Sequence, residues 1–151
     1  MKNDVQNIIT ALEHDGRFHM EKQFFQHGTT TVFDHSVKVA YTSVRLAKLL
    51  HLKTNRHALI RGALLHDYFL YDWHDKHHGH SPHGFSHPKT ALRNAQEDFA
   101  LDPIEENIIE RHMFPLTPCP PTCREAWLVC IADKYCALLE TIRDRIYPRT
   151  T

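Results

Sequence analysis

Most apolar residues in this chain recur at intervals of three and four, the spacing that gives a helix one apolar face. Val39, Leu46 and Leu49, for example, share one face of a helix predicted over 34–51. The whole pattern predicts helices over 5–14, 20–26, 34–51, 54–66, 86–100, 102–112 and 124–143. No pair of segments shows the alternation typical of paired strands. The pattern therefore predicts an all-α fold.

Prolines and small polar residues mark the expected helix starts. Thr54 is the expected N-cap of the helix over 54–66. Pro88 is expected in the first turn of a helix that begins at Ser86 or His87, where its missing N–H costs nothing. The pair Asp102 and Glu105 has the spacing of a capping box.

Length, charge and composition limit the class of protein. The 151 residues suit one domain, over 1–151, and 42% hydrophobic residues are enough for one core. Lys and Arg together number 18, as do Asp and Glu, so no basic surface for a nucleic acid polymer or an anionic membrane is expected. The first 15 residues lack the apolar core of a signal peptide, and the apolar run over 126–132 is too short to cross a bilayer. We expect a cytoplasmic protein with reduced cysteines.

Several polar residues fall on helix faces that should be buried, namely His35, His66, His112 and Asp133. A single buried histidine is usually explained by one hydrogen bond to a backbone carbonyl. A buried set of imidazole and carboxylate groups is better explained by a shared divalent metal, because each group would be costly to bury alone. This donor chemistry suits Fe, Mn, Ni, Co or Zn rather than Ca.

The ordered set His35, His66-Asp67, His87, His112 and Asp133 resembles the H…HD…H…H…D pattern of HD-domain metal-dependent phosphohydrolases. The resemblance implies a helical bundle, with a motif-bearing core over about 30–143 and the metal site among its central helices. The two intermediate histidines are similar to those of binuclear members. By that likeness, His35, His66, Asp67 and Asp133 would hold one ion, and Asp67 would bridge to a second ion held by His87 and His112. The implied cofactors are two divalent ions, with Fe or Mn favoured and Ni, Co or Zn as alternatives.

The resemblance also implies the reaction, which is hydrolysis of a phosphoester or phosphoanhydride bond by water that the metals activate, with Asp67 as the catalytic residue. No GYP signature occurs, and the residues after Asp67 lack the lysine found in several members that cleave cyclic dinucleotides, so that activity is not assigned. Small stand-alone members that cleave diadenosine polyphosphates are a nearer analogy. The expected partner is a small phosphorylated molecule, with a nucleotide favoured, and homo-oligomerisation is left open.

Five residues are candidates for substrate contacts. Lys89 is expected in the first turn of its helix, where the helix N-terminus favours anions. Lys134 and Arg111 adjoin expected ligands. All three cations are also explained as ordinary solvated charges. Trp73 and His74 begin a His-rich segment that is either a lid over the site or an exposed loop with adventitious metal affinity.

Two other functions compete with the enzyme. One is a non-catalytic nucleotide- or metal-binding module on the same HD scaffold, since a fold does not guarantee activity. The other is a metal-storage protein built around the His-rich segment, which deletion of 74–83 would disable. All positions of the metal motif are filled, which favours the enzyme.

Overall fold

The described part of the computed structural model, residues 2–72 and 83–146, is mostly helical, which confirms the predicted all-α class. Its elements along the chain are α1 (Lys2–Asp15), η1 (Phe18–Gln23, a 3₁₀ helix), β1 (Phe25–His27), β2 (Thr30–Thr31), α2 (Val32–Leu49), α3 (Arg56–Leu65), α4 (His83–Asp98), α5 (Pro103–Arg111) and α6 (Arg124–Ile146).

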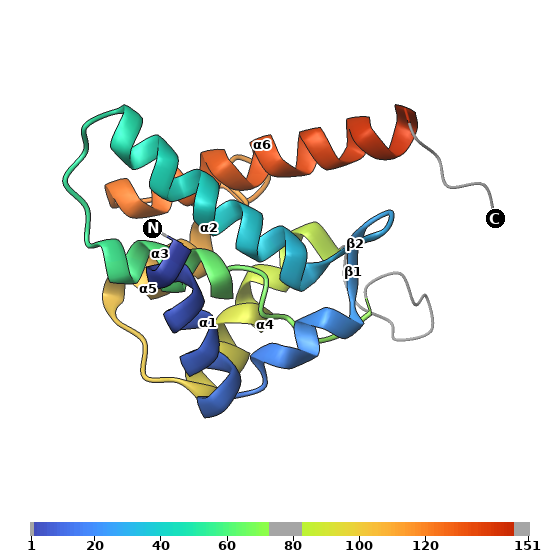
Figure 1. The fold of residues 1–151 in the computed structure, drawn as a ribbon, viewed down its shortest axis with the longest axis horizontal. Helices are drawn as coiled ribbons and strands as arrows, with labels where there is room; N and C mark the ends of the chain where they lie inside the picture. Colours follow the sequence, from blue (N-terminus) through green and yellow to red (C-terminus); the bar gives the residue numbers. More distant parts are fainter. Residues whose placement is uncertain (1, 73–82, 147–151) are drawn as a thin grey trace.

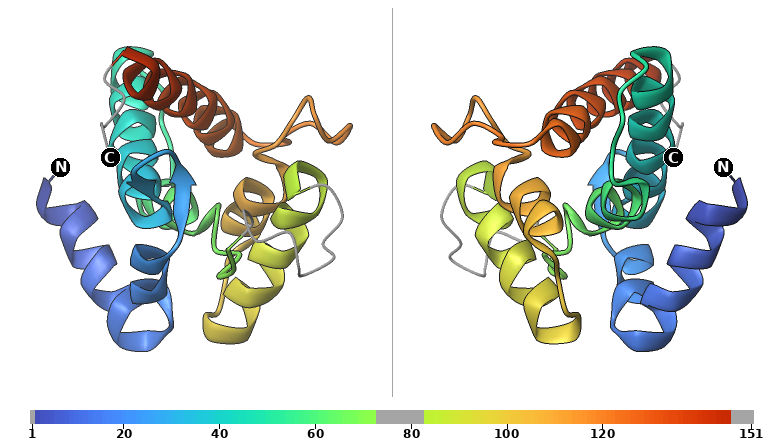
Figure 2. Two further views of the ribbon diagram at one scale, coloured as in Figure 1. Left: turned by 90° about the vertical axis from the view of Figure 1, so that its right-hand side faces the viewer. Right: turned by 90° about the vertical axis from the view of Figure 1, so that its left-hand side faces the viewer.

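Four helices form the centre of the fold. Helix α2 packs against α3 and α6, and α5 packs against the same two helices (Figure 1). Helices α1 and α4 lie on opposite sides of this centre (Figure 2). The buried core includes Val39 of α2, Ala63 of α3, Ile108 of α5 and Val129 of α6. The polar site described below lies among the helices that supply this core.

Close contact between α3 and α5 depends on one glycine. A Cβ added at Gly62 would lie 2.5 Å from Cδ1 of Ile108, well inside van der Waals contact. The absent side chain therefore lets the two helices approach at the level of the core.

The helix starts match the sequence only in part. The capping box at Asp102 and Glu105 is confirmed, but the N-cap of α3 is Asn55 rather than Thr54, with the Asn55 side chain accepting a hydrogen bond from the backbone N–H of Ala58. Helix α4 begins at His83, not at Ser86 or His87, so Pro88 lies inside the helix. A proline inside a helix loses one hydrogen bond and its ring crowds the carbonyl four residues earlier, but this cost does not fix where the helix begins. Lys89 is consequently not in the first turn.

A short hairpin replaces part of the helix expected over 20–26. Strands β1 and β2 pair antiparallel, with Phe25 opposite Thr31. Gly28 joins them with a φ of +52°, a left-handed conformation that suits glycine. Strands of three and two residues are too short to show alternation, which explains why the sequence pattern did not predict them. The hairpin leads directly into α2, whose N-cap is Thr31.

Helix α6 forms one long edge of the molecule and ends at Ile146, three residues beyond the expected end. Within the described ranges, no helix combines the length and the apolar character needed to cross a membrane.

Candidate metal centre

Side chains from five helices meet in the centre of the fold, all at least 92% buried. His35 lies in the first turn of α2, His66 and His112 are the C-caps of α3 and α5, and Asp67 follows His66. His87 and Asp133 lie within α4 and α6. The expected ligands therefore converge although they span 98 positions of the chain.

One part of the centre gathers donors around one oxygen of Asp67. Its Oδ2 lies 3.3 Å from Nε2 of His66 and 4.0 Å from Nε2 of His35. The Oδ1 of Asp133 lies 3.0 Å from Nε2 of His35 and 3.6 Å from Nε2 of His66. Two imidazoles and two carboxylates thus face one small volume.

The other part gathers around the second oxygen of the same carboxylate. Oδ1 of Asp67 lies 3.1 Å from Nε2 of His87 and 3.3 Å from Nε2 of His112. The two imidazole nitrogens are themselves 2.9 Å apart. Asp67 therefore presents one oxygen to each set of donors.

The donors form overlapping groups that could hold a metal ion, each with its ligand atoms within 4.8 Å of one another. The groups are His35, His66 and Asp67; His66, His112 and Asp133; and Asp67, His87 and His112. Buried imidazole and carboxylate donors at this spacing are consistent with a divalent metal site.

Backbone hydrogen bonds orient two of the histidines. Nδ1 of His66 lies 2.7 Å from the carbonyl oxygen of Ala63, and Nδ1 of His112 lies 2.8 Å from that of Ile109. A carbonyl oxygen only accepts, so each Nδ1 carries the proton. In the neutral rings, each Nε2 then presents a lone pair to the other donors, as a metal ligand requires.

Two buried atoms of the centre lack hydrogen-bond partners among the described residues. Nε2 of His66 and Oδ1 of Asp67 are buried and have no hydrogen-bond partner of good geometry among residues 2–72 and 83–146. Burying a polar atom without a partner costs free energy, and a divalent cation would satisfy both atoms at once. The residues present therefore fit a metal.

Without a metal, protons balance the buried carboxylates. Burial raises the pKa of Asp67, but the neighbouring His66 charge and the close approach of three imidazoles hold that pKa well below its usual range. Burial also works against a charged His35, yet its bonds to Asp133 and Glu140 raise the pKa of His35 to about 9. The pKa of His66 is likewise raised against burial by the two aspartates. A metal ion and these protons compete for the same lone pairs.

Sequence analysis missed Glu140, which orients the expected ligand His35. Its Oε2 accepts a hydrogen bond from Nδ1 of His35 at 2.9 Å, and its Oε1 accepts one from Nζ of Lys38 at 2.7 Å. Glu140 follows Asp133 by two helical turns and is therefore on the same face of α6. That spacing of seven was a signal available in the sequence.

The segment before α2 adds two more polar groups that carry no sequence signal. Nε2 of Gln26, in β1, donates to Oδ2 of Asp67 at 2.6 Å. Glu21, in η1, is fully buried, and its burial raises its pKa well above the usual range. Neither residue belongs to a recognisable motif, and the hairpin that places Gln26 was not predicted.

The structure describes three of the five expected substrate contacts. Nζ of Lys134 donates to the carbonyl oxygen of His112 at 2.7 Å and lies 3.9 Å from Oδ2 of Asp133. Arg111 donates to the carbonyl oxygen of Pro120 at 3.0 Å, which ties α5 to the proline-rich loop. Lys89 is exposed on α4. Trp73 and His74 lie outside the described residues, so the lid stays a prediction.

Comparison with protein families gives one match. The HD domain matches residues 32–138, more than half of the chain, and this range contains every expected metal ligand. The chain therefore belongs to the HD domain family, as its sequence motif indicated. Comparison with curated proteins and with solved structures gave no match.

Proposed function

We propose that this protein is a metal-dependent phosphohydrolase with two divalent ions, which cleaves a phosphoester or phosphoanhydride bond of a small phosphorylated molecule, with a nucleotide favoured. The observation that supports this most directly is the position of Asp67. Its two oxygens face two different sets of imidazoles, and a carboxylate between two ions needs that arrangement.

The chain's own residues divide into two ligand sets. His35, His66 and Asp133 would hold one ion together with Oδ2 of Asp67. The second set consists of His87 and His112 together with Oδ1 of the same carboxylate. When bound, a pair of divalent ions polarises phosphoryl oxygens and lowers the pKa of water to near neutrality.

Surrounding residues keep these ligands in position. The carbonyl oxygens of Ala63 and Ile109 fix the rings of His66 and His112, and Glu140 fixes His35. Rigid support of this kind matters because a small displacement of a ligand is costly to a reaction that depends on positioning. No serine or cysteine nucleophile is required, since water is the attacking group.

Phosphate recognition would fall to cations and to the residues that follow Asp67 in the chain. Lys89 stands two positions after His87 and is exposed, so it contributes as a cation rather than through the helix N-terminus. Lys134 is held by the carbonyl oxygen of His112, and Arg111 is held by that of Pro120 in the proline-rich loop. Trp73 and His74 complete the proposed set of substrate contacts.

Metal content followed by a substrate screen tests the proposal. Protein purified under reducing conditions would be supplied with Mn²⁺ or Fe²⁺ and incubated with nucleoside phosphates, dinucleoside polyphosphates, cyclic nucleotides and phosphomonoesters. We expect turnover of at least one substrate, and none for Asp67→Asn, which keeps the shape of the side chain but removes its charge. Metal-loaded wild-type protein that binds nucleotides without hydrolysing any member of the panel would instead support the binding module. Equal turnover by wild type and Asp67→Asn would refute the assignment of the site.

A further inference from the structure

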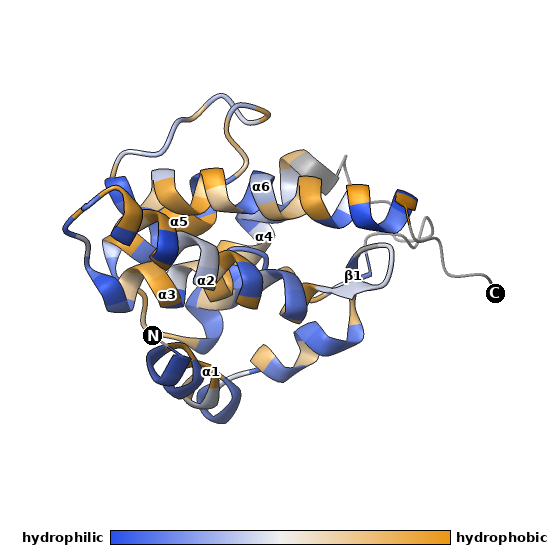
Figure 3. Ribbon diagram, turned by 45° about the horizontal axis from the view of Figure 1, so that its top comes forward, coloured by the Kyte–Doolittle hydropathy of each residue, from blue (hydrophilic) through white to orange (hydrophobic). Residues whose placement is uncertain are grey.

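The outer face of α6 carries a continuous stripe of large apolar side chains. They are Trp127, Ile131, Tyr135, Leu138, Ile142 and Ile146, each between 41% and 63% exposed, and Leu139, 47% exposed, flanks the stripe on one side. Figure 3 shows apolar positions recurring along this helix. The opposite face of α6 is buried and supplies Asp133 and Glu140 to the metal centre. The stripe is therefore not part of the site or of the core.

The spacing of the stripe is symmetric. Successive members are four, four, three, four and four residues apart, so the series reads the same in both directions. If two copies of α6 cross antiparallel about a two-fold axis between residues 136 and 137, every member meets another member. Trp127 then lies opposite Ile146, Ile131 opposite Ile142, and Tyr135 opposite Leu138 of the second chain. An isologous interface requires this self-complementarity, whereas an unrelated partner does not.

Charge does not oppose this pairing. Lys134, at the edge of the stripe, lies opposite Leu139 in the antiparallel register rather than opposite another cation. Arg145 is exposed near the end of α6, but Leu128, the position opposite it in this register, is buried in the core, so the two residues do not meet. Nζ of Lys134 donates to the carbonyl oxygen of His112 in its own chain, so its aliphatic stem rather than its charge borders the stripe.

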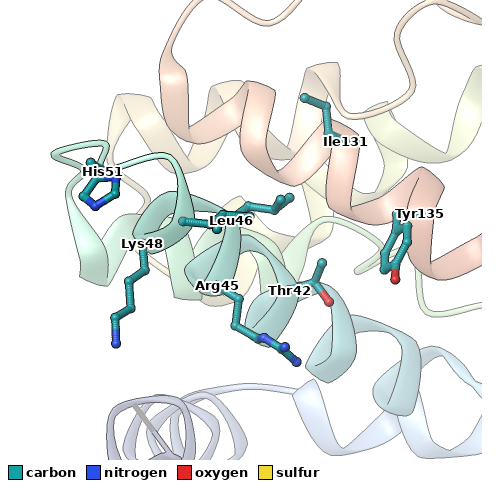
Figure 4. A pocket seen from close by; sticks show the side chains of 8 residues that line it. Thr42, Arg45, Leu46, Lys48, His51, Ile131 and Tyr135 are labelled. Carbon is teal, nitrogen blue, oxygen red and sulfur yellow. The ribbon is translucent and has the colours of Figure 1, made fainter.

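The neighbouring helix extends the apolar surface. A groove of about 820 Å³ lies between α2 and α6, with Leu46 and Leu49 on one side and Ile131 and Tyr135 on the other (Figure 4). Leu49 and Leu50 are 72% and 55% exposed at the end of α2. Side chains of a second copy could insert into this groove beside the stripe.

The exposed area suits a stable dimer. Eight large side chains, six on α6 and two at the C-terminal end of α2, each leave about half of roughly 150–200 Å² exposed, which gives about 700 Å² per chain. That is close to the roughly 800 Å² that each partner buries in an interface of standard size. It also exceeds the roughly 300–600 Å² of the largest apolar patch on a typical monomer.

We propose that two copies of this chain associate through the α6 stripe as an antiparallel two-fold dimer. The helix that forms the interface on its outer face supplies metal-centre residues on its inner face, so each copy would hold the other's α6 in place.

Solution mass and one charge-introducing variant test the association. Sedimentation velocity of the full chain should give a dimer, twice the chain mass of 17.7 kDa. Leu138→Glu places a carboxylate opposite Tyr135 on both sides of the axis, and we expect its dimer dissociation constant to rise at least 100-fold. Leu116→Glu is the matched control, because Leu116 is 46% exposed in the proline-rich loop and lies outside the stripe. Unchanged far-UV circular dichroism would show that both variants fold.

Cross-linking tests the antiparallel register. In a Cys119→Ser background, chains with Ile131→Cys and chains with Ile142→Cys are co-purified and treated with a short bis-maleimide. The mixed pair should cross-link, and neither variant alone should do so. Cross-linking of Ile131→Cys with itself would overturn the register. A wild-type monomer at 100 µM would overturn the dimer, as would a monomer that binds phosphatidylglycerol vesicles through the stripe.

Discussion

Substitution of Glu140 by glutamine tests how the metal centre is supported. Glu140 is only 4% exposed, and its carboxylate accepts the Nδ1 hydrogen bond of His35 at 2.9 Å. Glutamine keeps the shape and an acceptor oxygen but loses the charge. A hydrogen bond to a charged group contributes about 1.5–3 kcal/mol against about 0.5–1.5 kcal/mol for a neutral one, so the loss is about 1–1.5 kcal/mol.

That difference corresponds to about a 10-fold weaker metal affinity, at the lower end of the roughly 10- to 100-fold expected for residues that orient a ligand. Glu140→Ala should lie at the upper end, because it also leaves Nδ1 of His35 without its acceptor. Affinity would be measured for Mn²⁺ by competition with a fluorescent chelator. Lys38→Ala is the matched control, since it removes the 2.7 Å contact to Oε1 but leaves the bond to His35.

We expect Lys38→Ala to weaken metal binding less than about 3-fold, because the Lys38 side chain is 42% exposed and its ion pair is screened by solvent. Wild-type affinity in Glu140→Gln would refute the reasoning. A loss in Lys38→Ala equal to that in Glu140→Gln would also refute it, because the effect would then come from the ion pair and not from His35.

The remaining predictions concern pH and packing. The folded-state pKa of His35, about 9, lies above its unfolded value, so its stabilising effect is complete below about pH 6.5 and is lost as the pH rises through 9. Urea unfolding of the metal-free protein should therefore show a falling free energy of unfolding between pH 7 and pH 10, and a flat profile would contradict the buried ion pairs. Apparent Mn²⁺ affinity should rise over the same range, because metal displaces protons from the imidazoles; an affinity that falls with pH would show that they are not ligands. Gly62→Ala should lower the free energy of unfolding by about 1–3 kcal/mol, because its Cβ would lie 2.5 Å from Ile108, and an unchanged denaturation midpoint would show that α5 shifts freely.

The convergence of buried histidines and aspartates could be predicted from the sequence because these residues follow strong local signals. His66 and His112 end helices whose apolar stripes are clear, and both are observed as C-caps. The His66-Asp67 dipeptide and the order of the remaining histidines then carried the resemblance. Glu140 was also within reach, since it repeats the position of Asp133 two turns later on the same helix.

Contacts that depend on tertiary structure could not be predicted in this way. Gln26 reaches Asp67 only because a hairpin of a few residues turns at Gly28, and such short strands have no periodicity to detect. Glu21 lies in a 3₁₀ helix displaced from the α-helix expected there. The start of α4 differs from the prediction because Pro88, expected in the first turn, lies inside the helix.

The central claim is that the two oxygens of Asp67 would each serve a different metal ion. Elemental analysis of protein loaded with Mn²⁺ under reducing conditions tests it most directly, with His87→Ala, His112→Ala and Asp67→Ala beside the wild type. The arrangement around the two oxygens of Asp67 predicts two ions per chain in the wild type, about one in each histidine variant, and a loss of both in Asp67→Ala. A single ion in the wild type, or two ions retained by Asp67→Ala, would contradict it.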